Sequence, residues 1–233
     1  MCEPQRMCLV LLSLEPKARV GVRAICNYAS AKQWQGPPFN ADDFRGRFIV
    51  GALKADHSIM KGYQTLPVGA GGALVRVDHT NFELVPPAWA AWAAKVIAET
   101  MGSNRVVLTP LPSSKTTLST TEYRTLHLAQ LVKKAYKGEM VVWDGVRFKH
   151  ERKKVHEGGD RATIAEDMVL TTTIPDGNVV PLDDVYTMGS HLSALMKNLP
   201  QDRWPSLMVC GGRTIWDTPP KRTPDEFVHD FYG

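Results

Sequence analysis

Several classes of protein are excluded by what this sequence lacks. Its four cysteines form no Cys-x-x-Cys pair, so a zinc ribbon is absent. Long hydrophobic runs are also missing, and the longest early one, Met7 to Leu14, is too short to cross a bilayer. Neither charge sign dominates, because 28 Lys and Arg against 24 Asp and Glu give a net charge of +4. That excess is too small to indicate a nucleic-acid-binding protein.

The cysteine pattern and the first residues also bear on location. Few cysteines at irregular spacing, without a secretory context, indicate a reducing cytoplasm. Glu3 precedes the early apolar run, and Glu15-Pro16 follows it where a signal peptide has small residues. We therefore expect residues 7–14 to form a strand of a cytoplasmic protein without a membrane segment.

The composition is that of an ordinary globular protein. The chain has 233 residues, 43% of them hydrophobic and 22% charged, which fits one sizeable domain with or without a small appendage. A chain of this length buries enough surface to fold without a disulfide or a structural metal.

Apolar periodicity predicts alternating strands and helices. Residues 20–24 alternate as in a half-buried strand, and Asn40 precedes a helical pattern over residues 44–52. Further strands are expected at 105–109, 140–143, 168–174, 179–182 and 206–210, with helices after 86, 119 and 190. This order predicts an α/β fold with a mainly parallel sheet of about five strands. We expect an N-terminal extension or hood over 1–85 and a core domain over 86–233.

One helix start has a sequence signature of its own. Ser119 and Glu122 have the spacing of a capping box, in which each side chain bonds the backbone N–H of the other residue. The helix that follows is therefore expected to begin at Ser119.

Residues 179–192 carry the clearest chemical signal. A buried strand leads to Asp183 and Asp184, and a short loop containing Gly189 then enters a helix. The free N–H groups and positive dipole of a helix N-terminus bind phosphate, and glycine permits close backbone approach. The carboxylates can accept hydrogen bonds from a sugar diol or hold a cation, directly or through water. Together these groups describe a site for ribose 5-phosphate, and the alternative is a solvated turn with a helix cap.

The Asp-Asp-Val-Tyr-Thr run at 183–187 resembles the phosphoribosyl diphosphate (PRPP) signature of type I phosphoribosyltransferases, above all the ComF-like group. The resemblance extends over about residues 48–214. It implies the type I phosphoribosyltransferase fold, with Asp183 and Asp184 binding ribose hydroxyls or the metal. The residues implied to bind the 5-phosphate are Thr187, Met188, Gly189, Ser190 and His191.

Three other segments fit the same resemblance. Residues 108–112 resemble a strand ending in a Pro-hydrophobic-Pro loop, and the implied pyrophosphate ligands are Pro112, Ser113, Ser114 and Lys115. The basic stretch 147–161 resembles the mobile segment that closes over PRPP, and its candidates for catalysis are Lys153, Lys154 and Arg161. Gly212 and Arg213, expected after the last strand, are implied to contact the base.

The implied activity is transfer of a phosphoribosyl group between PRPP and a nitrogenous base, with pyrophosphate as co-product and Mg²⁺ as cofactor. PRPP and a nucleobase-like acceptor are the implied partners, and homodimers are common in the family. Two alternatives stay open. One is a PRPP or nucleotide sensor without turnover, and the other is an accessory protein of DNA uptake or modification.

The chain also departs from the ComF-like pattern. The N-terminal zinc-binding cysteine cluster is missing, and Pro181 removes a hydrogen-bond donor inside a strand. Met188 and His191 stand where the family has a small residue and a small hydroxyl residue. Residues 113–123 replace the family's Arg-Gly-aromatic-Asn run, so the sequence does not name the base.

Overall fold

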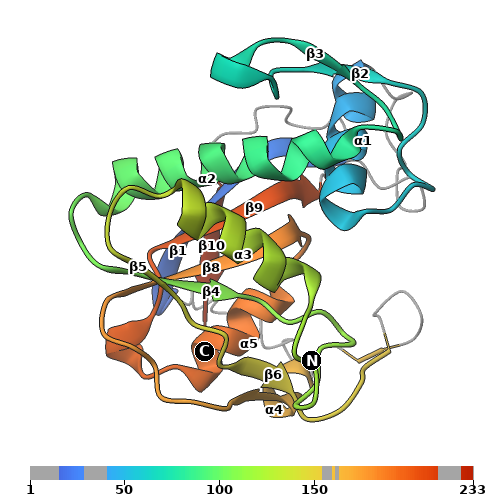
Figure 1. The fold of residues 1–233 in the computed structure, drawn as a ribbon. Coiled ribbons are helices and arrows are strands. Elements are labelled where there is room, and N and C mark those ends of the chain that lie inside the picture. Colours follow the sequence, from blue (N-terminus) through green and yellow to red (C-terminus); the bar gives the residue numbers. More distant parts are fainter. Residues whose placement is uncertain (1–15, 29–40, 154–158, 161–162, 215–226, 233) are drawn as a thin grey trace, which may run out of the picture.

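The computed structural model describes residues 16–28, 41–153, 159–160, 163–214 and 227–232. Its centre is a six-stranded sheet in the order β10-β1-β9-β8-β4-β5 (Figure 1). All of these strands run parallel except β10, which pairs antiparallel with β1 at one edge. The strands are β1 (Ala18–Tyr28), β4 (Val106–Pro110), β5 (Met140–Val142), β8 (Asn178–Tyr186), β9 (Leu207–Thr214) and β10 (Phe227–Phe231). The predicted α/β class with a mainly parallel sheet is confirmed, with one strand more than expected.

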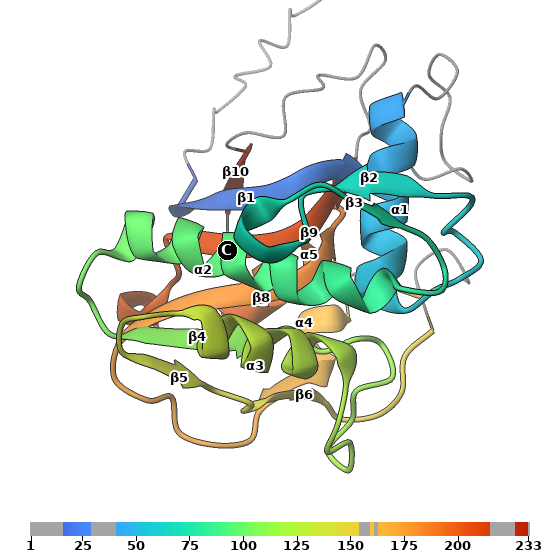
Figure 2. The same cartoon turned by 45° about the horizontal axis from the view of Figure 1, so that its top comes forward.

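Helices cover both faces of this sheet (Figure 2). One face is covered by α1 (Ala41–Lys54), α2 (Val85–Met101) and α3 (Arg124–Ala135), and the other by α4 (Ile164–Asp167) and α5 (Ser190–Asn198). The face of α5 also carries a two-stranded sheet of β6 (Val146–Phe148) and β7 (Met168–Leu170). Because side chains alternate along a strand, Val180 and Leu182 of β8 pack toward α1–α3, whereas Val179 packs toward α5.

Smaller elements complete the chain. A second two-stranded sheet, of β2 (Gln64–Leu66) and β3 (Val75–Val77), extends beyond α1 at one corner (Figure 1). The short 3₁₀ turns are η1 (Ala70–Gly72), η2 (Phe82–Leu84) and η4 (Gln201–Arg203). No helix among the described residues is both long enough and apolar enough to span a membrane.

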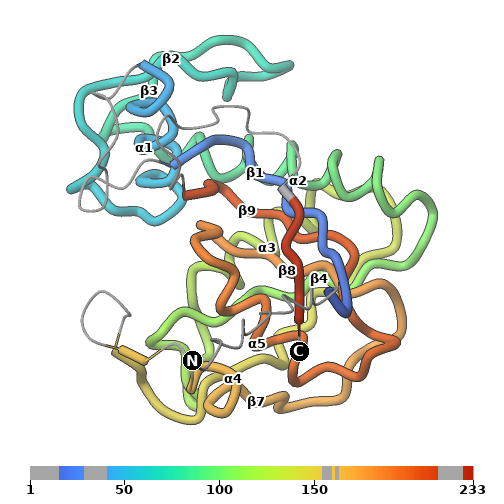
Figure 3. The backbone as a smooth tube through the Cα atoms, turned by 180° about the vertical axis from the view of Figure 1, so that it is seen from behind, coloured from blue at the N-terminus to red at the C-terminus, as the bar shows by residue number. Residues whose placement is uncertain are grey.

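The N-terminal strand belongs to the central sheet. The alternation over 20–24 is confirmed as β1, whose Val20 and Val22 are buried. β1 lies between β9 and β10, and Figure 3 shows it beside β9, so this early strand is part of the central sheet. The helical pattern over 44–52 is α1, while Asn40 and the expected strand at 7–14 lie outside the described residues.

Three local expectations are wrong. The expected strand at 168–174 is shortened to β7, which pairs with β6 and not with the central sheet. The last parallel strand continues to Thr214, and β10 follows it. The capping box at Ser119 does not form, because the threonines before the helix bond one another: the amide of Thr117 donates to Oγ1 of Thr120 at 2.9 Å, and α3 begins only at Arg124.

Candidate functional site

The loops after β4 and β8 open at the same edge of the sheet. The two strands are parallel neighbours with Pro110 opposite Leu182, and the amide of Leu111 donates to the Leu182 carbonyl at 2.9 Å. The carboxyl ends of neighbouring parallel strands form the ligand crevice of open α/β sheets. The segments predicted to hold pyrophosphate and the 5-phosphate therefore follow neighbouring strands at the same edge of the sheet.

Asp183 and Asp184 face opposite sides of the sheet. Both were expected beyond a strand end, but β8 continues to Tyr186, and consecutive strand residues point to opposite faces. Oδ2 of Asp183 lies 3.9 Å from Nδ1 of His191 on α5. Oδ1 of the same residue accepts the Asp184 amide at 2.8 Å. The two carboxylates therefore leave the strand on opposite faces, although they stay close enough for the charge of Asp184 to raise the pKa of Asp183.

Both carboxylate oxygens of Asp184 face a cation. Nη1 of Arg124 donates to Oδ2 at 2.5 Å, and Nζ of Lys54 lies 4.0 Å from Oδ1. Arg124 is the first residue of α3, and Lys54 is the last residue of α1. Sequence reasoning missed both as site residues. Arg124 is 60 positions from Asp184, so no local spacing could reveal this contact.

Burial controls the protonation of the groups on the α5 side. Burial raises the pKa of Asp183 well above its ordinary range, and the neighbouring charge of Asp184 raises it further. Burial lowers the pKa of His191 to about 4. His191 is therefore neutral at pH 7.

The loop between β8 and α5 has the backbone shape that a phosphate loop needs. Gly189 is the N-cap of α5 and has a φ of +70°, which favours glycine. Thr187 and Met188 are exposed at the surface of this loop. The loop is supported from behind, because the imidazole of His229 on β10 is within hydrogen-bond distance of the Tyr186 hydroxyl, at 2.9 Å, and of the Ser193 hydroxyl, at 3.0 Å.

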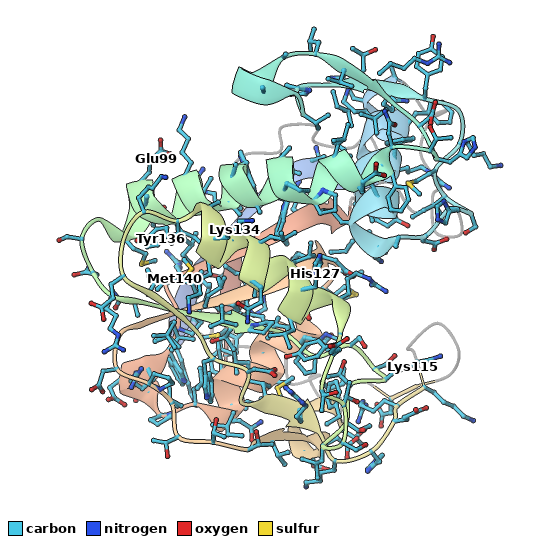
Figure 4. The ribbon with its side chains drawn as sticks, viewed as in Figure 1. Glu99, Lys115, His127, Lys134, Tyr136 and Met140 are labelled. Carbon is cyan, nitrogen blue, oxygen red and sulfur yellow. The ribbon has the colours of Figure 1, made fainter. Side chains whose placement is uncertain are left out.

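The predicted pyrophosphate loop is a turn rich in hydroxyl groups. The amide of Ser113 donates to Oγ1 of Thr116 at 3.1 Å, so this amide is already engaged within the turn. The carbonyl of Ser114 accepts the amide of Arg152 at 2.8 Å. Pro112 is buried, and Lys115 is exposed at the outer end of the loop (Figure 4). The loop is thus tied through Arg152 to the basic segment 147–161.

Two cations of that basic segment have structural partners. Arg147 lies buried in β6 and forms two hydrogen bonds with the carboxylate of Asp144, at 2.5 and 2.7 Å. Arg152 is ion-paired with Asp167. Lys153 is exposed, while Lys154 and Arg161 lie outside the described residues.

The residues expected to contact the base lie inside β9. Gly212 is buried under α1, and a Cβ there would lie 2.6 Å from Cγ2 of Val50. Arg213 is half-buried in the same strand. The expectation that both follow the last strand is wrong, because the pairing of β9 with β1 continues as far as Thr214.

A cavity of about 280 Å³ opens beside Arg124. Its walls come from the end of α1, from η2 with the start of α2, and from α3, where Figure 4 labels His127. Most of the lining is apolar, including Leu53, Phe82 and Leu128. The volume is near the lower end of the range for small-molecule sites, about 300 Å³.

The diacid does not fit a directly coordinated Mg²⁺. Magnesium takes oxygen ligands in near-octahedral geometry, and both oxygens of Asp184 already face cations. Within the part of the chain that the structure describes, no three His, Cys, Asp or Glu residues gather into a group that could hold a metal. The Mg²⁺ expected from the resemblance therefore lacks a set of direct protein ligands here.

Comparisons with known proteins give distant structural similarity only. No protein-family model matches the chain, and no curated protein matches it significantly. A hypoxanthine phosphoribosyltransferase from Staphylococcus aureus is similar with a TM-score of 0.36 and 9% identity, over 56% of this chain and 73% of that one. A hypoxanthine-guanine phosphoribosyltransferase from Bacillus anthracis has a TM-score of 0.34 and 13% identity, over 56% of this chain and 67% of that one. Similarity at this level does not identify a function.

Proposed function

We propose that this chain is a cytoplasmic phosphoribosyltransferase of the type I, ComF-like kind, acting on PRPP and a nitrogenous base. One observation carries the proposal: two neighbouring parallel strands run toward the same edge of the sheet. β4 ends at Pro110 and leads into the loop that begins Leu111-Pro112, while β8 continues through Asp183 and Asp184 to a left-handed glycine turn into α5. This arrangement offers backbone amides for phosphate beside a carboxylate acceptor for ribose hydroxyls.

The role of each residue follows from where negative charge develops during the reaction. The bond from ribose C1 to pyrophosphate oxygen breaks and pyrophosphate leaves with the electron pair. A bond from C1 to a nitrogen of the base forms, and the base releases its N–H proton to water. The turn at Thr187–Ser190 would hold the 5-phosphate and Asp184 would accept a ribose hydroxyl. Lys115 and Lys153, both exposed, would offset the charge on pyrophosphate.

The first test measures binding of PRPP by calorimetry and by thermal shift. A ligand that binds only the native state raises the melting temperature by mass action. The variant is Asp184→Asn, and the matched control is Asp230→Asn on β10, whose carboxylate pairs with Arg19 at the surface. We expect binding to be lost in the first variant and kept in the second. Absence of PRPP binding by the unmodified protein would overturn the proposal.

Turnover needs a separate measurement. A panel of purine and pyrimidine bases, with detection of released pyrophosphate, would identify the acceptor. One observation favours a second candidate, a PRPP- or nucleotide-binding regulator without turnover: Arg124 and Lys54 already hold the carboxylate that would meet ribose. Tight PRPP binding without pyrophosphate release for any base would favour this regulator over the enzyme.

A further inference from the structure

The ion pairs at Asp184 place fixed cations where the sequence predicts a divalent cation. Arg124 and Lys54 approach different oxygens of one carboxylate, at 2.5 and 4.0 Å, and they come from different helices. The Asp184 side chain is only 12% exposed, so these two cations face a carboxylate that is largely withdrawn from water.

Both cations are held by the fold. The hydroxyl of Thr125, the residue after Arg124, donates to the Leu111 carbonyl at 2.6 Å and so fixes the start of α3 against the loop after β4. Nζ of Lys54 also lies 5.9 Å from the centre of the Tyr28 ring. The clamp formed by Arg124 and Lys54 therefore belongs to the packed edge of the sheet.

The charge balance at this edge disfavours a metal ion. Even with Asp183 and Asp184 both ionised, their two negative charges are cancelled by Arg124 and Lys54. Before PRPP binds, a dication would have to approach two fixed positive charges, and these four side chains carry no net negative charge to attract it. A phosphorylated ligand, by contrast, is attracted by these two positive charges. The guanidinium of Arg124, with its five N–H donors, is also suited to phosphate oxygens. Arg124 has 44% of its side chain exposed and can present donors beyond the one that Asp184 takes.

We infer that Arg124 and Lys54 take the place of the divalent cation, so that this site binds PRPP without Mg²⁺. The inference rests on the proposed function, since it concerns the same site. Arg124 contacts an anionic oxygen of PRPP, and Asp184, held by the clamp, remains the acceptor for a ribose hydroxyl.

The test compares PRPP binding in EDTA with binding in millimolar MgCl₂. Calorimetry on the unmodified protein is expected to give dissociation constants within about threefold of each other. Arg124→Gln is expected to weaken binding in EDTA by about tenfold or more, the usual effect of losing a charge-assisted hydrogen bond. Lys95→Gln is the matched control, because Lys95 is an exposed residue of α2 paired only at the surface with Glu99.

Folding is checked separately, because Arg124→Gln leaves Asp184 with one cation fewer. The melting temperature without ligand is measured for each variant, and Arg124→Lys, which keeps the charge, is expected to retain most of the affinity in EDTA. Binding that requires Mg²⁺ would overturn this inference and leave the proposed function standing. Equal EDTA affinities for Arg124→Gln and the unmodified protein would also overturn it. No PRPP binding in either buffer would overturn the proposed function, and this inference with it.

Discussion

Gly189 packs directly against the imidazole of His229. A Cβ on Gly189 would lie 2.5 Å from Cε1 of that ring, and the glycine has a φ of +70°. Gly189 caps α5 and His229 belongs to β10, so the C-terminal strand supports the loop that we assign to phosphate.

Gly189→Ala is expected to destabilise the protein. The left-handed backbone costs a non-glycine residue about 1–2 kcal/mol, and the contact with His229 adds to this cost. Urea denaturation measures the loss. In a His229→Ala background the contact with the ring is relieved, while the backbone cost and the approach to the Tyr186 hydroxyl at 2.7 Å stay, so the substitution should cost less there. The same cost in both backgrounds would contradict the contact.

Asp144→Ala is expected to lower the free energy of unfolding by about 3–5 kcal/mol, because it leaves the buried guanidinium of Arg147 without its carboxylate. The Arg147 side chain is only 8% exposed, so water cannot replace the lost partner. Lys153→Ala, at an exposed position of the same segment, should change stability by no more than about 0.5 kcal/mol. Similar denaturation midpoints for both variants would show that Arg147 has no structural role.

The contribution of His191 to stability should decrease as the pH falls from about 6.5 to about 4, whereas the raised pKa of Asp183 acts in the opposite direction. The pKa of His191 is about 4 in the folded protein and about 6.5 in the unfolded chain, so its unfolded state binds more protons in this window. The side chain is 32% exposed, which limits its contribution to about 1 kcal/mol. His191→Gln should flatten the pH dependence of urea denaturation, and an unchanged slope would contradict the assignment.

Ala55→Gly is expected to stabilise the protein by about 0.5–1 kcal/mol. Ala55 follows α1 with a φ of +49°. Its amide donates to the Ala52 carbonyl, and the amide of Asp56 donates to the Gly51 carbonyl. These two hydrogen bonds form a Schellman motif, in which glycine is preferred at the position of Ala55. Ala91→Gly, on the exposed side of α2, should instead lose about 1 kcal/mol. Thermal unfolding compares the two variants. A loss of stability in Ala55→Gly would contradict the prediction that the left-handed backbone at Ala55 is strained.

The spacing of apolar residues along the sequence was enough to predict the strands and helices that bury one face. The apolar alternation of β1 and the 3.6-residue periodicity of α2 were sufficient, because each element buries one face. The end of β8 could not be predicted, since Asp183-Asp184 has the composition of a turn. The strand continues because β9 pairs alongside it, with Asp183 opposite Cys210 and Val185 opposite Gly212.

The partners of Asp184 and the strand β10 were missed for the same physical reason. Each depends on a contact between residues far apart in the chain, such as Arg124 with Asp184 or Val20 with His229. Such contacts are fixed by the packing of whole elements and leave no periodic signal in a single sequence. The charge that surrounds a carboxylate is therefore known only after the fold is known.

The position of β1 between β9 and β10 also affects how the chain can fold during synthesis. Its parallel partner β9 starts at Leu207, long after Tyr28 ends β1. A ribosome adding about 5–20 residues per second needs roughly 10–40 s to cover that interval. Throughout this time the apolar face formed by Val20 and Val22 has no sheet to join. The nascent chain therefore presents an unpaired, aggregation-prone strand until β9 has been synthesised.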